Sequence, residues 1–334
     1  MIGLGHLGKF HARVYAKLPE VELRYLVDSD LPRAQAVASE CGGQAQADYR
    51  GILREVDAVS VVTPTGTHHA IARDFLGAGV SVLVEKPMAS TVEEADDLIR
   101  AAAAAGVRLQ VGHIERFNPA YVAVRDSIKE PAFIEGHRLS PYSFRSTEVS
   151  VVLDLMIHDL DLTLDIAGAA AVSQEAAGVP ILSGTPDIAN ARLRFGGAGG
   201  AKGCIANLTA SRVSLKPMRR LRVFQRDEYI SMDFLEKKAY VFRKKEGFDA
   251  LRADSGILAA AAKLPKEHAL GQLVDIRPMT VGPADALESE LSSFVQAVRT
   301  GATPLVTGEH GRRALALAVA IDEDIRRFIA ERRG

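Results

Sequence analysis

The chain has 334 residues, of which 47% are apolar and 25% charged, and its formal net charge is −1. This composition is typical of a folded protein with a substantial core, and the length predicts two domains. A near-neutral balance excludes a global field that would attract nucleic acid or an anionic membrane, so any phosphate must be recognised by local groups.

Cysteine usage and the hydropathy pattern indicate where the protein works. Cys41 and Cys204 stand far apart, without a CxxC pattern or a His/Cys cluster, which argues against a disulfide framework or a metal site. No apolar run reaches the length of a membrane span, and glycines arrive too early for a signal peptide. We therefore expect a cytoplasmic protein without metal, nucleic-acid partner or membrane partner.

Short apolar runs alternate with stretches of helical length over the first 116 residues. The expected strands are rich in Val and Leu and lie at 23–27, 58–62, 80–84 and 107–111. The expected helices lie between them, at 31–40, 68–78 and 92–105. Such strands suit a parallel sheet covered on both faces, and the alternation predicts βαβ units. We assign residues 1–116 to an α/β nucleotide-binding domain.

The pattern changes after about Phe117. An apolar helix is expected at 149–167, and five strands at 189–195, 202–211, 221–225, 229–234 and 239–243. Many strands in succession predict an open, largely antiparallel sheet, so residues 117–334 should form an α+β domain for substrate binding and oligomerisation. The stretch 247–281 shows no clear pattern, and two helices at 284–300 and 308–332 end the chain.

A GxGxxG motif begins at the third residue. Gly3 permits a tight turn, Gly5 lets a pyrophosphate approach the backbone, and Gly8 allows close helix packing. Asp28 ends the next strand 20 residues after Gly8, where a carboxylate accepts the adenosine ribose hydroxyls. An Asp there repels the extra phosphate of NADP, partly offset by Arg33, so we predict NAD. The alternative is a glycine-rich turn beside a surface aspartate.

The first strand is unusually short. Only Met1 and Ile2 precede Gly3, whereas a central strand of this kind should have about five or six residues. We expect either a clipped first strand or a natural start upstream of Met1.

Two sets of polar residues are candidates for chemistry. Lys86 directly follows the strand at 80–84, at the edge where open α/β sheets bind ligands, although a surface lysine before a turn is the alternative. In the apolar helix, one face carries four titratable side chains: Asp154, His158, Asp161 and Asp165. A polar stripe on a buried helix must face partners or a cleft. From the residues alone, a core histidine paired with its i−4 aspartate stays open as the alternative, and a metal at His158-Asp159 is a weaker one.

Taken together, these motifs resemble the glucose-fructose oxidoreductase/inositol dehydrogenase/MocA (Gfo/Idh/MocA) family over essentially the whole chain. The matching pieces are GLGHLG, the strand to Thr63-Pro64 with His68, Glu85-Lys86-Pro87, Gly112-His113 to Arg116-Phe117, Asp154-x-x-x-His158, Glu290-Leu-x-x-Phe294 and Pro304 to Gly311. The resemblance implies a Rossmann domain, a second open-sheet domain, NAD, and a catalytic set of Lys86, Asp154 and His158.

The resemblance also implies roles for this set. His158 would take the hydroxyl proton, Lys86 would stabilise negative charge on that oxygen, and Asp154 would orient His158 or pair with Lys86. The cofactor would be lined by the glycine turn and the loops after the strands: Gly3, Gly5, His6, Leu7, Gly8, Asp28, Thr63, Pro64, His68, Glu85 and Lys86.

Within the family, three stretches resemble the nucleotide-sugar branch: 112–119, 154–161 and 207–212. This implies a sugar linked to a nucleoside diphosphate, and arginine forks suit a diphosphate. The expected substrate residues are Arg116, Asn118, Arg138, Arg145 and Asp161. The segment 137–147 that carries two of these arginines is otherwise a solvated loop or an oligomer contact.

Two other functions stay open at this point. One is a dehydrogenase of a free sugar or polyol such as inositol, which needs no diphosphate clamp. The other is a non-catalytic NAD-sensing regulator, although such a protein usually lacks the Lys/Asp/His set. We also expect a homodimer or homotetramer built through the open sheet, with Val223, Ile230 and Val241 on the self-association surface.

Overall fold

The computed structural model describes residues 1–143, 149–197, 203–246 and 273–332. The chain divides into two compact units, which are described here one at a time. The first unit comprises Met1–Phe117, Val152–Leu162 and Ala284–Glu323, and the second comprises Asn118–Val151, Thr163–Pro283 and Asp324–Gly334. The first cut along the chain thus falls at Phe117, beside the expected boundary. Unit 1 additionally takes the segment with Asp154 and His158 and much of the C-terminal helices.

Unit 1 contains the expected parallel sheet. Its strands are β1 (Tyr25–Val27), β2 (Gln44–Gln46), β3 (Ala58–Val61), β4 (Ser81–Glu85) and β5 (Leu109–Gly112). β1 pairs with β2, and β4 lies between β3 and β5, all in parallel. Ile2 forms parallel bridges to Val27 and to Val61, so the start of the chain lies between β1 and β3.

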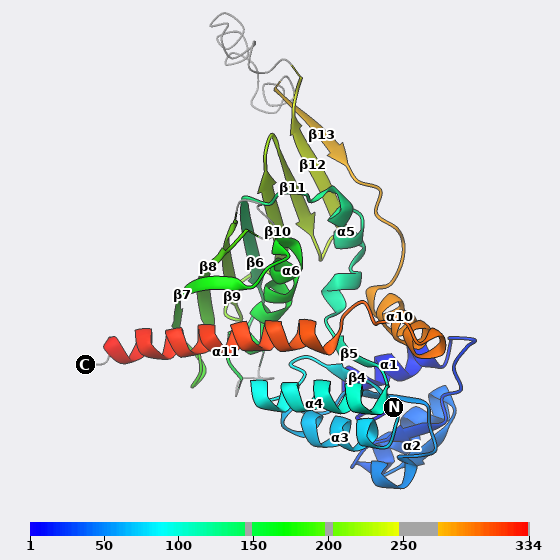
Figure 1. The fold of residues 1–334 in the computed structure, drawn as a ribbon. Helices are drawn as coiled ribbons and strands as arrows, with labels where there is room; N and C mark the ends of the chain where they lie inside the picture. Colours follow the sequence, from blue (N-terminus) through cyan, green and yellow to red (C-terminus); the bar gives the residue numbers. More distant parts are fainter. Residues whose placement is uncertain (144–148, 198–202, 247–272, 333–334) are drawn as a thin grey trace, which may run out of the picture. The chain divides into compact units, whose positions relative to one another are not determined.

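Helices cover both faces of this sheet and bury two apolar cores. The helices of unit 1 are α1 (Gly8–Tyr15), α2 (Leu31–Cys41), α3 (Thr65–Gly77), α4 (Val92–Ala105), α10 (Ala286–Thr300) and the first part of α11 (Gly308–Glu331). One core takes Phe75 and Leu98 from α3 and α4, which lie side by side (Figure 1). The other joins Tyr15 of α1 to Leu291 and Phe294 of α10. Each such buried side chain contributes about 1.5–3 kcal/mol, so α10 is integral to unit 1.

Unit 2 is built on an eight-stranded sheet, ordered β13-β12-β11-β10-β6-β9-β8-β7. Its strands are β6 (Phe133–Leu139), β7 (Ala171–Val179), β8 (Ile188–Phe195), β9 (Ile205–Ser211), β10 (Met218–Gln225), β11 (Glu228–Asp233), β12 (Lys238–Lys244) and β13 (Val274–Pro278). β6 and β9 pair in parallel, and the other neighbours are antiparallel. The predicted fold class, an α/β Rossmann unit plus a largely antiparallel sheet, is therefore confirmed.

The remaining described elements are short, apart from one helix that passes from unit 1 into unit 2. They are η1 (Tyr49–Ile52), η2 (Ile114–Phe117), α5 (Pro119–Val122), η3 (Arg125–Ser127), the π-helix η4 (Val152–Met156) and α6 (Ile157–Ala167). The expected apolar helix at 149–167 is thus a π-helical turn followed directly by α6. None of the described helices is long and apolar enough to cross a membrane.

The two faces of the large sheet differ, but the prediction of which residues are exposed was wrong. Val223 and Ile230 are fully buried and Val241 is 6% exposed, so they belong to the core face. The opposite face carries half-buried aromatic side chains, among them Phe224 and Tyr229. Alternate residues of a strand point to opposite faces of the sheet, so the two faces carry different side chains. The aliphatic side chains are buried because removing them from water is favourable.

Candidate active site

The glycine turn has the geometry that a dinucleotide phosphate requires. Gly3 has φ +83°, and a Cβ there would lie 2.5 Å from the carbonyl oxygen of Val62. A Cβ on Gly8 would lie 1.9 Å from the carbonyl oxygen of Gly3, so only glycine lets α1 pack on the turn. A Cβ on Gly5 would meet no heavy atom within 4 Å, and the Leu7 side chain does not cap α1. The turn therefore offers open backbone beside a helix N-terminus, which fits a pyrophosphate.

Asp28 follows β1 and is held firmly at the side of this turn. Its carboxylate accepts the Leu4 N–H at 2.8 Å and the Asp30 N–H at 2.9 Å, and it is 8% exposed. The half-exposed Arg33 guanidinium lies 3.1 Å from the same carboxylate. These contacts fix the orientation of the Asp28 carboxylate, and its contact with a ribose hydroxyl stays a prediction. Arg33 is the cation expected to soften the repulsion of a phosphate by Asp28.

The loops after β3 and β4 are joined by a buried histidine. The ring nitrogens of His68 lie 2.7 Å from the carbonyl oxygen of Thr63 and 2.9 Å from that of Pro87, and the residue is 1% exposed. His68 therefore supports the loop that carries Thr63 and Pro64. His6 and Leu7 lie just before α1 and are exposed. Contact of these two residues, and of Thr63 and Pro64, with the cofactor stays a prediction.

Two members of the predicted catalytic set meet directly. Lys86 lies at the end of β4, and its Nζ donates to the backbone carbonyl of Asp154 at 2.7 Å and lies 3.7 Å from the Asp154 carboxylate. Both side chains keep some exposure, 15% and 28%. Asp154 is in the π-helical turn Val152–Met156, a kind of irregularity frequently found at functional sites. His158 is half-buried and follows Asp154 by four residues, in the first turn of α6.

The other carboxylates of the polar stripe have partners within the protein. Asp161 is buried and accepts from both Nε (2.6 Å) and Nη2 (3.1 Å) of buried Arg116, a bidentate pair. Asp165 is exposed and accepts a hydrogen bond from the Tyr121 hydroxyl. Both carboxylates of this helix face thus bind partners within the protein. The other two members of the face, Asp154 and His158, are partly exposed.

The predicted substrate residues are mostly buried. Arg116 and Asp161 are 4% and 1% exposed and bind each other. Asn118 is 7% exposed, and its side chain caps α5 by accepting the Ala120 N–H at 3.1 Å. Arg138 is 2% exposed within β6, and Arg145 lies outside the described residues. Arg116, Asp161 and Asn118 thus have partners within the protein, and contact of these residues with a substrate stays a prediction.

The pairing of Glu85 with the buried His11 escaped the sequence analysis, which named Glu85 only as a residue that lines the cofactor. The Nε2 atom of His11 lies 3.2 Å from Oε1 of Glu85, whose Oε2 accepts the Lys86 N–H at 3.2 Å. A Cβ on Gly112 would lie 2.9 Å from the Glu85 carboxyl carbon, so this glycine makes room for it. Burial alone would raise the pKa of Glu85, but the His11 hydrogen bond and the charges of His11 and Lys86 hold it below the ordinary value. The available signal was a histidine on the inner face of the helix after GxGxxG.

Unit 2 contains a second buried ion pair, between Asp187 and Arg212. Asp187 accepts the N–H groups of residues 181, 182 and 183 on one oxygen and Arg212 Nε at 2.9 Å on the other. Burial acts to raise the pKa of Asp187, but these hydrogen bonds outweigh it and leave the pKa far below normal. Arg212 also donates to the carbonyl oxygen of Val149 at 2.7 Å. Arg212, which lies in the third nucleotide-sugar-like stretch, therefore fixes the backbone before the π-helical turn.

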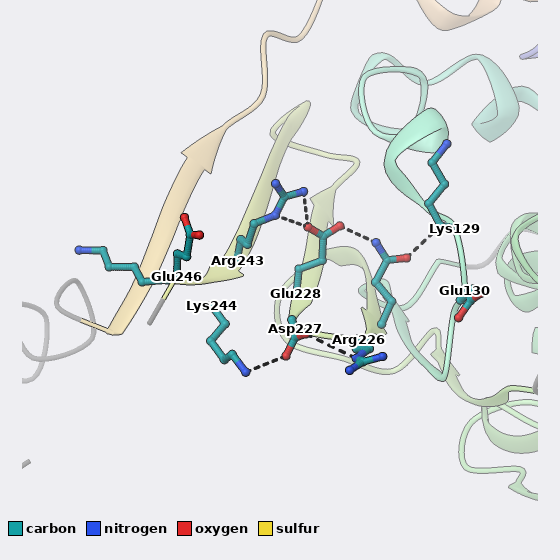
Figure 2. Close-up of a pocket in the computed structure, with 10 residues that line it drawn as sticks. Lys129, Glu130, Arg226, Asp227, Glu228, Arg243, Lys244 and Glu246 are labelled. Atoms are coloured by element: carbon teal, nitrogen blue, oxygen red, sulfur yellow. Dashed lines mark hydrogen bonds and ion pairs between the residues drawn. The ribbon is translucent and has the colours of Figure 1, made fainter. Parts of the chain in front are cut away.

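Figure 2 shows a groove in unit 2 that carries none of the predicted site residues. Its walls are polar side chains, all but one of them charged, from the β10–β12 region and the segment before β6: Lys129, Glu130, Gln225, Arg226, Asp227, Glu228, Arg243, Lys244, Lys245 and Glu246. Arg243 binds Glu228 at 2.8 Å and Lys244 binds Asp227 at 3.0 Å (Figure 2). These four charged side chains therefore have partners within the groove itself. In the part of the chain that the structure describes, no three His, Cys, Asp or Glu side chains are arranged to hold a metal ion.

Comparison with known proteins agrees with this geometry. A family model described as "Oxidoreductase family, NAD-binding Rossmann fold" matches residues 1–113. The chain is 37% identical to UDP-N-acetylglucosamine 3-dehydrogenase of Acidithiobacillus ferrooxidans over 98% of this chain and 97% of that protein. A solved structure of that dehydrogenase superposes with a TM-score of 0.84 and 36% identity, covering 98% of this chain and 97% of that one.

More distant relatives act on inositols by name. A scyllo-inositol 2-dehydrogenase (NAD(+)) of Bacillus subtilis is 31% identical over 52% of this chain and 54% of its own length. A solved structure of a putative myo-inositol dehydrogenase from Sinorhizobium meliloti shares the fold, with a TM-score of 0.74, 21% identity and coverage of 98% and 96%. The chain belongs to the Gfo/Idh/MocA family of oxidoreductases and is an NAD-dependent dehydrogenase that acts on CH–OH groups.

Proposed function

We propose that the substrate is a UDP-N-acetylhexosamine and that its 3-hydroxyl is oxidised to a ketone. The observation that carries this proposal is the 37% identity, over 98% of the chain, to a protein named UDP-N-acetylglucosamine 3-dehydrogenase. An inositol 2-dehydrogenase of Rhizobium meliloti also aligns with the whole chain, but at only 24% identity. The higher whole-chain identity therefore favours the nucleotide sugar over a free polyol.

Lys86, Asp154 and His158 would supply the proton and charge changes that such an oxidation needs. Alcohol oxidation removes a proton from the oxygen and a hydride from the carbon, and NAD, when bound, would supply the hydride acceptor. The His158 imidazole takes the hydroxyl proton, because imidazole exchanges protons near neutral pH. The Lys86 ammonium stabilises the negative charge that develops on the oxygen. Asp154 fixes that ammonium through its carbonyl oxygen at 2.7 Å.

A nucleotide sugar adds a diphosphate, which this near-neutral chain must meet with local cations. Arg145, which lies outside the described residues, stays the proposed diphosphate ligand, and Arg138 stays a second proposed substrate residue. A thermal-shift screen tests the proposal: with NAD present, UDP-N-acetylglucosamine should raise the Tm more than free N-acetylglucosamine or myo-inositol. An equal shift with the free sugars would favour the polyol alternative instead.

We propose further that the chain forms a homo-oligomer through the open face of the large sheet. Four aromatic rings from neighbouring strands follow one another across this face: Phe133, Phe224, Tyr229 and Phe242, with centroid distances of 5.8, 5.2 and 4.1 Å. All four are half-buried, and an apolar stripe of this kind on a sheet marks an association surface.

Light scattering tests the oligomer. Tyr229→Lys should lower the average mass toward that of the monomer, whereas Glu20→Lys, an exposed change in unit 1, should leave it unchanged. A concentration-independent monomer for the unmodified protein would refute the proposal.

We also propose that the protein works in the cytoplasm, because Cys41 and Cys204 are free thiols, as is usual for proteins in a reducing compartment.

A further inference from the structure

Glu290 is a fully buried carboxyl group in α10 that the mechanism does not use. It is 0% exposed, and neither side-chain oxygen has a hydrogen-bond partner among the described residues. Its backbone carbonyl accepts the Gln110 Nε2–H at 3.2 Å, which fixes the helix against β5 at this point. An ionised carboxylate without partners is strongly disfavoured in such a place, because burial removes the water that stabilises its charge.

The neighbouring acids already have cationic or hydrogen-bonding partners. Asp161 is neutralised by Arg116, and Glu85 is held by His11 and by the Lys86 N–H. Burial raises the pKa of Glu290 well above its ordinary value, and the negative charges of Glu85 and Asp161 raise it further. Of these three acids, Glu290 is the one that is fully buried without a hydrogen-bond partner for its side chain among the described residues, so its ionised form is the most disfavoured.

Titratable groups from several elements interact electrostatically with Glu290. Glu85 on β4 and Asp161 on α6 act on Glu290, and Glu290 acts on Tyr15 of α1. Around these groups, His11 and Lys86 act on Glu85, and Arg116 and Lys86 act on His113 after β5. Buried Gln110 Oε1, His11 Nδ1 and His113 Nδ1 also lack hydrogen-bond partners within the described ranges. A protonated carboxyl brings one O–H donor to a region with several possible acceptors.

We propose that Glu290 is a positioning residue that carries a proton in the resting enzyme and thereby keeps the Glu85 carboxylate bound to His11 and to the backbone of Lys86. If Glu290 lost that proton, its negative charge would oppose that of the Glu85 carboxylate. Glu85 would then take up the proton or move, and the Lys86 segment would lose its support. The consequence for catalysis rests on the proposed function of Lys86, but the protonation of Glu290 does not.

Infrared spectroscopy of the full-length protein tests the proton directly. At neutral pH the unmodified protein should show the carbonyl stretch of a protonated carboxylic acid, and Glu290→Gln should remove it. Glu288→Gln, the same change at an exposed position of the same helix, should retain the band. If the band is missing from the unmodified protein, or survives in Glu290→Gln, the proposal is overturned.

The pH dependence gives a second, independent test. Because the folded-state pKa of Glu290 is raised, the folded protein binds the proton more tightly, and stability falls as pH rises toward that pKa. Denaturant unfolding of Glu290→Gln should lack this part of the decline, whereas Glu288→Gln should follow the unmodified protein.

The pH at which kcat falls on the alkaline side tests whether Glu290 positions Glu85 or only packs in the core. In Glu290→Gln this pH should rise by about one unit or more, since an amide cannot ionise. An unchanged kcat profile with a changed infrared spectrum would refute the positioning role alone. If no sugar is turned over, the infrared and unfolding results still decide whether Glu290 holds a proton.

Discussion

Lys86 and His158 are the side chains on which the proposed chemistry depends. We expect Lys86→Ala and His158→Ala each to lower kcat by at least about 10²-fold, since each removes a charge-stabilising or proton-transfer group. The Kd for NAD should change little. Steady-state kinetics and an NAD titration measure both quantities, with exposed Lys17→Ala as the control. A variant at either position that keeps full turnover would exclude that residue from the reaction.

We propose that Asp28 controls the choice between NAD and NADP. Asp28→Ala should weaken NAD binding and relax the preference against NADP, because it removes the ribose acceptor and leaves Arg33 free of its carboxylate. Binding titrations with both cofactors provide the measurement. Tighter binding of NADP than of NAD by the unmodified protein would contradict the assignment.

Variants of the buried Arg116–Asp161 pair test whether these residues stabilise the fold or bind the substrate. Removing one partner leaves a buried, uncompensated charge, so Arg116→Met should lower the free energy of unfolding by about 3–5 kcal/mol. The double variant Arg116→Met/Asp161→Leu should recover much of this loss in denaturant unfolding. A stable Arg116→Met protein with a raised KM for the sugar would instead restore the substrate role.

At the scale of elements, the sequence predicts well where side-chain type and burial agree. The run from Val80 to Val84 is apolar throughout, as a strand buried on both faces requires, and it forms β4. β6 was missed because its period of two is interrupted by Gly136 and by Arg138, a buried charge. β7 was missed because its sequence, AVSQEAAGV, is mostly small and polar.

The candidate site could be predicted only where it depends on local sequence. The positions of the glycine turn and of Lys86 could be predicted, because a turn and a strand end are local features. The π-helical turn does not, since the residues Val152 to Met156 read equally well as an α-helix. The partners of Arg116 and Glu290 come from distant segments, and only the folded chain brings them together.

At the scale of the molecule, unit 1 is assembled from three separated segments. A fragment ending at residue 117 would lack Leu291 and Phe294 of α10, and Val306 and Leu315 from the cores of the same unit. We therefore expect it to be far less stable than the whole chain, with apolar surface exposed. Circular dichroism and denaturant unfolding check this expectation. A fragment that unfolds cooperatively at the denaturant concentration of the whole protein would contradict the division into units.

Oxidation of a UDP-linked N-acetylhexosamine by this dehydrogenase can be measured directly as NADH formation. NADH formation is followed from UDP-N-acetylglucosamine, free N-acetylglucosamine and myo-inositol, each with a reagent that traps the ketone product. We expect strong NADH formation from the UDP-linked sugar, dependent on the trap, and little from the other two. Equal NADH formation from the free sugars would contradict the nucleotide-sugar assignment.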